Sequence, residues 1–178
     1  MRKNVSYISD YSYICVKVIK NFVHAMNSTP KLNFPAINLR AKRDNERTLV
    51  FDEVRSMYGV LTPEEWGRRH LVAFFMRYCG VTLHSIVEEY PVNLNNMAQR
   101  ADVVVMDNNA QPIILAECKA PDVNLNNENI LQQVYAQATR YNAVVQARYI
   151  IITNGLQHFC FEHTQEGYTP LTTFPKLG

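Results

Sequence analysis

RADVVVMDNNAQPIILAECKAP, residues 100–121, contains two apolar runs on either side of the polar segment NNAQ. Two apolar runs joined by a short polar segment are typical of a β-hairpin. If NNAQ forms the loop, Asp107 pairs with Pro112. In that register Asp102 lies opposite Glu117, and opposed residues point to the same face with Cβ atoms about 5 Å apart. The stretch therefore predicts two carboxylates side by side on one face of a sheet.

A third charged residue belongs to the same face. Because side chains alternate along a strand, Lys119 points to the same side as Glu117, and Cys118 points into the core. Two carboxylates repel each other in a half-buried site, so a cation between them favours the arrangement. Carboxylate oxygens are hard ligands that suit Mg²⁺ or Mn²⁺ rather than zinc. With a lysine that can orient or deprotonate a water molecule, these are the parts needed for metal-assisted phosphodiester hydrolysis.

The competing interpretation is an ordinary ion pair on a solvent-exposed hairpin, which contributes little to stability. Val104, Ile113 and Leu115 share the predicted acidic face. That face should therefore be at least partly covered, which favours a site over a surface pair.

Outside the hairpin, further strands and helices follow one another along the chain. LHSIVEEYPVNL predicts a strand over about 84–94, and ARYIIITNGLQHFCFEH predicts two strands joined by an Asn-Gly turn. ENILQQVYAQATRYNAVV predicts a helix over about 127–145. Nearer the N-terminus, short strands are expected over 48–51 and 57–61, preceded by the charged turn AKRDNER. This order predicts a mixed α/β fold with a central sheet flanked by two main helices.

The other main helix is predicted from TPEEWGRRHLVAFFMRYCG. Thr62 can cap it, Pro63 suits the first helical position, and Glu65 completes a T-x-x-E capping box. Gly67 weakens the first turns by roughly 1 kcal/mol relative to alanine. Gly80 ends the helix.

Composition places the chain among ordinary globular proteins. Its 178 residues suit one domain, and 47% apolar with 19% charged residues exclude a disordered chain. The net charge of +2 creates no strong field, so a nucleic-acid partner would need a local basic patch. The four cysteines form no CxxC pattern, which favours reduced thiols in a cytoplasmic protein over zinc or disulfides. No apolar run approaches the roughly 20 residues of a membrane span.

The first 25 residues differ in sequence pattern from the rest of the chain. Residues 1–25 begin with basic residues, but charged residues such as Asp10 interrupt the part that an export signal keeps apolar. Two interpretations remain open. The segment is either an appendage upstream of a native start at Met26 or a packed N-terminal helix. In the first case a single domain spans 26–178.

Three motifs, in order, resemble a known superfamily. RAD (100–102), ECK (117–119) and QATRY (137–141) together resemble the PD-(D/E)XK nucleases. TPEEW, RADVVV, ECKAP, RYN and TNGLQH are similar to the N-terminal domain of type I restriction enzyme R subunits, in its small stand-alone form. Each motif alone is weak, and their order and spacing are specific. The resemblance covers about residues 45–165 and implies a restriction-endonuclease-like core.

The resemblance also implies a site. Asp102 and Glu117 would ligate Mg²⁺, for which Mn²⁺ can substitute, and the backbone carbonyl of Cys118 would add a ligand. Lys119 would position or activate the attacking metal-bound water.

Gln137 and Tyr141 lie four residues apart, hence on one helix face. The resemblance implies that they contact the DNA backbone or hold Lys119 and the metal site in position. The alternative is an ordinary helix surface with a half-buried tyrosine.

Related nucleases often supply another carboxylate from the first helix. Glu65 is the candidate, with Glu64 second, although Glu65 already has the capping role. Arg68 and Arg69 either touch phosphate or form a solvated helix face. Relatives tend to have glutamine in place of Arg69.

Two functions follow from the resemblance. The first is a Mg²⁺-dependent DNA endonuclease-like domain, catalytic through Asp102, Glu117, Lys119, Gln137 and Tyr141, with Glu65 as the helix carboxylate. The second is a catalytically weak or inactive nuclease-fold module that binds DNA or restriction-modification proteins. No Walker-type Gly-Lys-Ser/Thr motif is present for an ATPase motor. A purely structural assembly domain is a third, weaker alternative.

Overall fold

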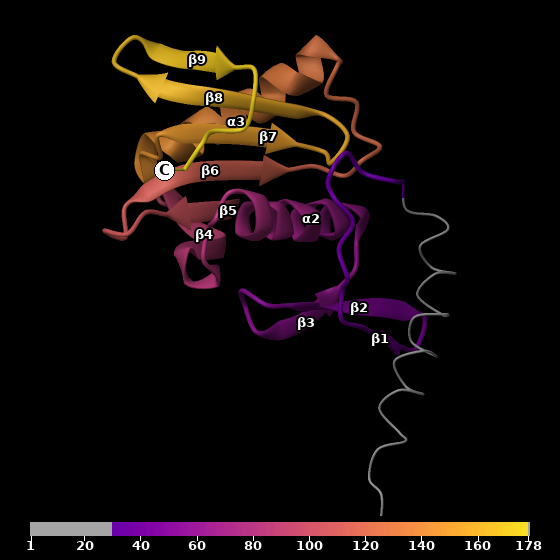
Figure 1. Ribbon diagram of the computed structural model, residues 1–178. Helices are drawn as coiled ribbons and strands as arrows, with labels where there is room; N and C mark the ends of the chain where they lie inside the picture. Colours follow the sequence, from indigo (N-terminus) through magenta and orange to yellow (C-terminus); the bar gives the residue numbers. More distant parts are fainter. Residues whose placement is uncertain (1–29, 178) are drawn as a thin grey trace, which may run out of the picture.

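The computed structural model describes residues 30–177, which form a mixed α/β fold with two sheets and two helices (Figure 1). The smaller sheet contains β1 (Ala41–Asp44), β2 (Arg47–Asp52) and β3 (Met57–Val60). The larger sheet contains β4 (Ile86–Leu94), β5 (Met97–Met106), β6 (Pro112–Cys118), β7 (Tyr149–Thr153), β8 (His158–Thr164) and β9 (Gly167–Leu171). The helices are α2 (Pro63–Tyr78) and α3 (Glu128–Val145), and a short 3₁₀ turn, Leu83–Ser85, precedes β4. The fold class predicted from the sequence is confirmed. The N-terminal segment 1–25 and Cys15 lie outside the described residues.

The larger sheet has the order β4-β5-β6-β7-β8-β9 and is mixed. Only β6 and β7 run parallel, and the other neighbours are antiparallel. Parallel neighbours need a long crossover connection, and α3 provides it between β6 and β7. The connection places α3 on one face of the sheet.

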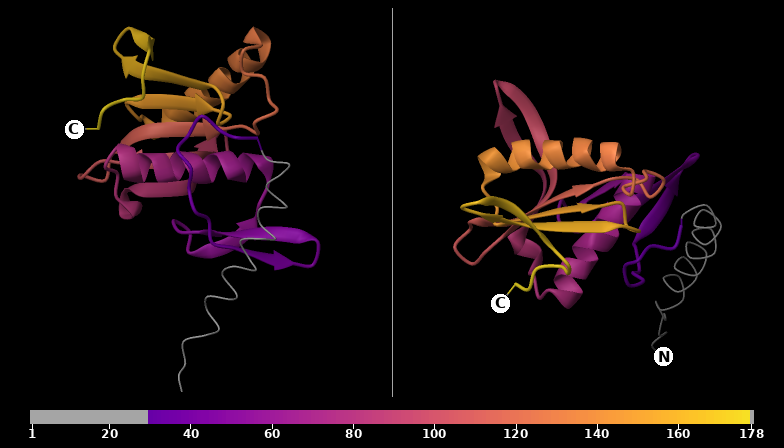
Figure 2. Two further views of the ribbon diagram at one scale, coloured as in Figure 1. Left: turned by 45° about the vertical axis from the view of Figure 1, so that its right-hand side comes forward. Right: turned by 90° about the horizontal axis from the view of Figure 1, so that it is seen from above.

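The two helices cover opposite faces of the larger sheet (Figure 2). On the α2 side, Val103, Val105 and Ile114 pack against Leu71 and Phe75 in one core cluster. Burial of a side chain as large as leucine or phenylalanine contributes about 2 kcal/mol.

On the α3 side, Val104, Leu115 and Ile150 pack against Val134 and Ala138 in a second core cluster. A strand covered on both faces is apolar along its whole length. This explains why PIILAECKA contains so few polar residues, and it makes the buried Glu117 an exception that needs a partner.

The β5–β6 hairpin has the predicted register over most of its length. Val103 pairs with Ala116, and Val105 pairs with Ile114. The predicted pair of Asp107 with Pro112 is wrong, because Met106 pairs with Pro112 and the register shifts between Val105 and Met106. The Asp107 side chain instead accepts backbone hydrogen bonds from Asn109 and Gln111 within the loop.

Two strands were missed by the sequence patterns. The segment AKRDNER, expected to be only a charged turn, contains β1 and the start of β2. Strand β9 at the sheet edge contains Pro170, a residue that sheets tolerate mainly in edge strands. The expected pair of strands over 48–51 and 57–61 is confirmed as β2 and β3.

Helix α2 starts as its sequence predicts. The Thr62 hydroxyl accepts a hydrogen bond from the Glu65 N–H at 3.0 Å, and Pro63 is the first helical residue. The Glu65 carboxylate does not cap the helix in return and is drawn toward Arg69, whose Nε lies 2.9 Å from Oε1. The capping-box prediction is therefore half correct, because a buried cation attracts the carboxylate more strongly.

Cys79, Cys118 and Cys160 are free thiols, and the last two are buried. Within residues 30–177, no helix is both long and apolar enough to cross a membrane.

Candidate functional site

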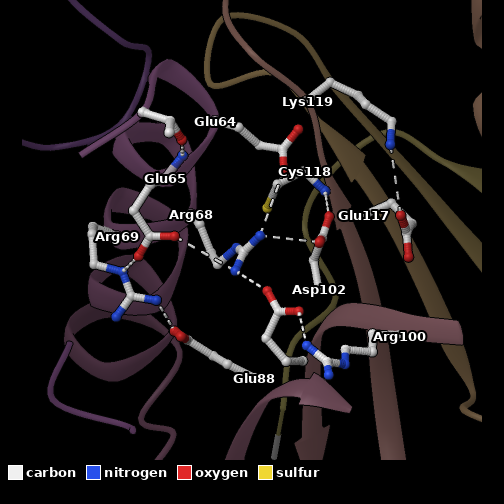
Figure 3. Close-up of polar contacts among 12 residues, drawn as sticks. Glu64, Glu65, Arg68, Arg69, Glu88, Arg100, Asp102, Glu117, Cys118 and Lys119 are labelled. Carbon is white, nitrogen blue, oxygen red and sulfur yellow. Dashed lines mark hydrogen bonds and ion pairs between the residues drawn. The ribbon is translucent and has the colours of Figure 1, made fainter. Parts of the chain in front are cut away.

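The candidate site lies beside the middle of β5 and the C-terminal end of β6, next to the start of α2 (Figure 3). The middle of α3 contributes Gln137 to it. The carboxylate of Asp102 accepts a hydrogen bond from the backbone N–H of Cys118 at 2.7 Å. The Cys118 side chain is buried in the α2-side core, as predicted. The Cys118 N–H thus bonds to a side chain rather than to a backbone carbonyl of β5. Asp102 lies one residue before Val103, where the pairing of β5 with β6 ends.

Glu117 lies on the other side of β6, beneath α3. It is almost fully buried, and its Oε2 accepts a hydrogen bond from Gln137 Nε2 at 3.0 Å. Gln137 Oε1 accepts a hydrogen bond from Lys119 Nζ at 3.4 Å, and Nζ lies 3.8 Å from Glu117 Oε2. One glutamine amide therefore connects the buried carboxylate to the lysine.

Tyr141 extends this chain of hydrogen bonds. Its hydroxyl accepts from Gln137 Nε2 at 3.3 Å and donates to Gln99 Oε1 at 3.3 Å. Tyr141 is 7% exposed, so it is more buried than the half-buried tyrosine of an ordinary helix surface. The two motif residues of α3 thus lie on one helix face, as their spacing predicted, and Gln137 contacts Glu117 and Lys119.

Asp102 does not follow strict strand alternation. Val104 faces α3, but the Asp102 carboxylate lies 3.1 Å from Arg68 Nη2 of α2. In the neighbouring strand Glu89 has a φ of 53° and makes no ladder pair with Asp102. This interruption lets Asp102 turn toward α2 while Glu117 stays on the α3 side. The Asp102 carboxylate thus contacts Arg68 of α2 and the Glu117 carboxylate contacts Gln137 of α3, so the two do not share one regular face as predicted.

Three carboxyl groups in this region have raised pKa values, because they are buried and lie near one another. Burial raises the pKa of Glu117 above its usual range, Asp102 raises it further, and Lys119 opposes both. Burial also raises the pKa of Asp102, against the opposing effects of Arg68 and the Cys118 N–H. The pKa of Glu64 is raised by burial and then by Asp102. The site therefore favours a cation or a proton.

The two glutamates of the first α2 turn point to different places. Glu64 lies 3.5 Å from Arg68 Nη2, the same nitrogen that donates to Asp102. Glu65 faces Arg69, and its Oε2 lies 3.5 Å from Arg68 Nη1. The predicted helix carboxylate Glu65 therefore reaches Asp102 only through Arg68.

Sequence patterns missed a buried charged cluster beneath α2. Asp52, Glu65 and Glu88 have carboxylate oxygens within 4.8 Å of one another, close enough to hold a metal ion. Arg69 already contacts all three, with Nη1 2.8 Å from Asp52 and a short ion pair to Glu88. Arg55 forms a further ion pair with Asp52. Arginines thus take the positions that a metal would need.

The charged cluster explains the two arginines of α2. Arg68 and Arg69 are 6% and 4% exposed, which excludes a solvated helix face. Burial raises the pKa of Glu88 to about 8, with Asp52 raising it and Arg69 opposing. The pKa of Asp52 is lowered, because hydrogen bonds with Glu88 and Arg55 outweigh its burial. The sequence signal was present in the consecutive charges of VEEY within a predicted strand.

A known protein family matches the part of the chain that contains both helices and the larger sheet. Residues 63–175, more than half of the chain, match the family described as the type I restriction enzyme R protein N terminus. The chain belongs to this family. As a restriction enzyme R N-terminal domain, it is related to restriction-modification. The family match begins at the first residue of α2 and ends beyond β9, so it covers both helices and the larger sheet. No curated protein matches the chain.

Proposed function

We propose that this restriction enzyme R N-terminal domain is a Mg²⁺-dependent, PD-(D/E)XK-type DNA endonuclease-like domain that hydrolyses phosphodiester bonds. The observation that carries the proposal is the joint placement of Asp102, Glu117 and Lys119, with Gln137 bonded to the last two. The motifs are 15 to 35 residues apart in the chain, and contacts join them: Asp102 accepts the Cys118 N–H, and Gln137 bonds to Glu117 and Lys119. The family match supports DNA and restriction-modification proteins as partners.

The donor set fits Mg²⁺ or Mn²⁺. Glu117 Oε1 is buried and has no hydrogen-bond partner among the described residues, whereas Oε2 accepts from Gln137. A buried carboxylate oxygen without a donor is costly unless a cation or a proton satisfies it. Asp102 supplies a second hard oxygen, and the backbone carbonyl of Cys118 is the proposed third. Glu64 is better placed than Glu65 to join them from α2.

A bound Mg²⁺ would polarise the phosphate and lower the pKa of a water molecule. The protein's own groups supply the rest. Lys119, with a side chain that is 22% exposed, can reach a phosphate while Gln137 keeps its ammonium beside Glu117. Lys119 would orient the attacking water and neutralise charge that develops on the phosphate. Tyr141 would hold the Gln137 amide in the orientation that serves both neighbours.

The second candidate function is a nuclease-fold module with weak or no catalysis that binds DNA or restriction-modification proteins. The net charge of +2 favours it, because strong DNA binding relies on many lysine and arginine contacts to phosphate. Under this interpretation a partner protein would bring the module to DNA.

The proposal is tested with plasmid, single-stranded and branched DNA incubated with purified protein and Mg²⁺ or Mn²⁺. We expect cleavage that Lys119→Ala and Asp102→Asn each reduce about 100-fold or more, the usual size of such catalytic losses. Asn at position 102 can still accept the Cys118 N–H, so folding should be kept. Glu162→Gln is the matched control, since Glu162 lies on β8 and its carboxylate pairs with the exposed Arg148, just before β7. If cleavage persists in Asp102→Asn, or if the unmodified protein cleaves none of the substrates, the second candidate function is favoured.

A further inference from the structure

Arg68 is a buried cation that is surrounded by carboxylates. Its Nη1 lies 2.6 Å from Glu89 Oε1 and 3.5 Å from Glu65 Oε2, and its Nη2 lies 3.1 Å from Asp102 and 3.5 Å from Glu64. Only 7% of its side chain is exposed, so solvent screens these contacts weakly. One guanidinium thus links the α2 glutamates to Asp102 in the middle of β5.

Both carboxylate oxygens of Asp102 are in use in this arrangement. Oδ2 accepts the Cys118 N–H, and Oδ1 accepts from Arg68. The Cys118 N–H belongs to the backbone of β6 and cannot move away without disturbing the strand. The Arg68 side chain can move. A divalent ion that binds Asp102 therefore meets a second cation, the Arg68 guanidinium 3.1 Å from Oδ1, and the two cations repel each other.

Glu89 provides a second partner on the far side of the guanidinium. Its φ of 53° lies in the left-handed region, which non-glycine residues rarely adopt within a strand and which costs on the order of 1 kcal/mol. This conformation turns the Glu89 carboxylate toward Arg68, so that Glu88 and Glu89 both form ion pairs with arginines of α2. Arg68 can thus leave Asp102 and still keep a charged hydrogen bond.

We propose that Arg68 is an internal competitor of the metal ion, exchanging Asp102 for Glu89 when a divalent cation binds. Arg68 keeps Asp102 neutralised when no ion is bound, and Glu89 sets how readily Arg68 is released. This inference rests on the proposed metal site at Asp102 and Glu117. Arg68 is a positioning residue here, since it acts on the ion through Asp102.

The test is calorimetric titration of Mn²⁺ into the full chain and three variants. Arg68→Gln removes the competitor, and we expect about tenfold or tighter Mn²⁺ binding, the size of one lost charged hydrogen bond. Glu89→Gln leaves Arg68 with Asp102 as its main partner and should weaken binding about threefold or more. Arg100→Gln is the matched control. It removes a positive charge 3.7 Å from Glu89 on a side chain that is 71% exposed, and should change binding less than about twofold.

The outcomes separate this inference from the proposed function. If the unmodified chain binds Mn²⁺ and Arg68→Gln binds it equally or more weakly, Arg68 is no competitor while the metal site stands. If Arg100→Gln tightens binding as much as Arg68→Gln, general electrostatics explains the effect and the inference fails. If neither the unmodified chain nor any variant binds Mn²⁺, the metal site itself is refuted. Should Arg68→Gln not fold, a Glu89→Gln variant with unchanged affinity overturns the inference.

Discussion

Glu117 and Glu88 are both buried carboxyls, but their neighbours differ. Glu117 has one oxygen bonded to an amide and one without a hydrogen-bond partner among the described residues. Glu88 Oε2 also lacks a hydrogen-bond partner among the described residues, but Glu88 pairs with Arg69 and its Oε2 lies 3.4 Å from Arg55. A carboxylate already neutralised by arginine gains little from a metal ion, whereas a buried carboxylate without an arginine beside it gains much. Single side chains thus separate a candidate metal site from a structural charge cluster.

We expect the Glu88 carboxyl to make the free energy of unfolding depend on pH, and Glu88→Gln to remove this dependence. Its pKa is raised to about 8 in the folded chain, from 4.5 when exposed. The stability that it contributes is fully present below 4.5 and is lost as the pH rises through about 8. Between pH 6 and 9, the free energy of unfolding should fall by roughly 2 kcal/mol more in the unmodified chain than in Glu88→Gln.

Denaturant unfolding of both proteins at several pH values measures this difference. The other titrating groups are shared by the two proteins, so their effects cancel. Parallel curves for the two proteins would show that Glu88 is ionised throughout this pH range.

At the scale of elements, the N-terminal half of α2 positions most of the charged groups. Thr62 and Pro63 determine where the helix begins, and one turn later Arg68 reaches Asp102. Gly67 lies in this segment, where an added Cβ would be 3.8 Å from the backbone carbonyl of Lys119. That distance is an ordinary contact, so close packing does not require glycine here.

Gly67→Ala should therefore stabilise the protein. Alanine favours a helix interior by roughly 1 kcal/mol over glycine, and an increase of about that size in the free energy of unfolding is expected. The contrasting variant is Gly155→Ala, because Gly155 has a φ of 82° and its Cβ would lie 2.8 Å from Leu32. That variant should be destabilised in the same denaturant titration. A loss of stability in Gly67→Ala would mean that α2 must approach Lys119 more closely.

At the scale of the whole molecule, the two sheets are joined by charge. The family match covers the larger sheet and both helices, whereas the smaller sheet lies before it. Asp52 of β2 and Arg55 nonetheless contribute to the buried cluster with Arg69 and Glu88. Three carboxyls and two arginines balance if one proton is retained, which agrees with the raised pKa of Glu88.

Metal binding should stabilise the whole domain if the proposed site is correct. Mn²⁺ at 100 times its dissociation constant adds about 2.7 kcal/mol, which raises the melting temperature by about 5 °C or more for a chain of this size. Thermal unfolding with and without Mn²⁺ measures the shift, and Asp102→Asn should abolish it. An equal shift in Asp102→Asn would place the ion elsewhere, with the Asp52, Glu65 and Glu88 cluster as the first alternative.

Local signals in the sequence were enough to predict the hairpin strands, both helices and the order of the motifs. Apolar periodicity and turn residues act between near neighbours, so they can be recognised without the fold. The same locality explains the correct placement of Gln137 and Tyr141 on one helix face. Edge strands such as β9 lack this periodicity, because one side of the strand is open and Pro170 is tolerated there.

Tertiary structure alone decided which α2 glutamate faces Asp102. Glu64 and Glu65 differ by about 100° around the helix axis, and the packing of α2 on the sheet sets that angle. It also decided that Arg68 and Arg69 are buried, because their partners come from β4 and β5 and, for Arg69, from β2 as well. Such contacts join residues far apart in the chain and leave no periodic pattern. The sequence by itself determined the elements and the motif residues, whereas the packing of those elements determined which charges meet.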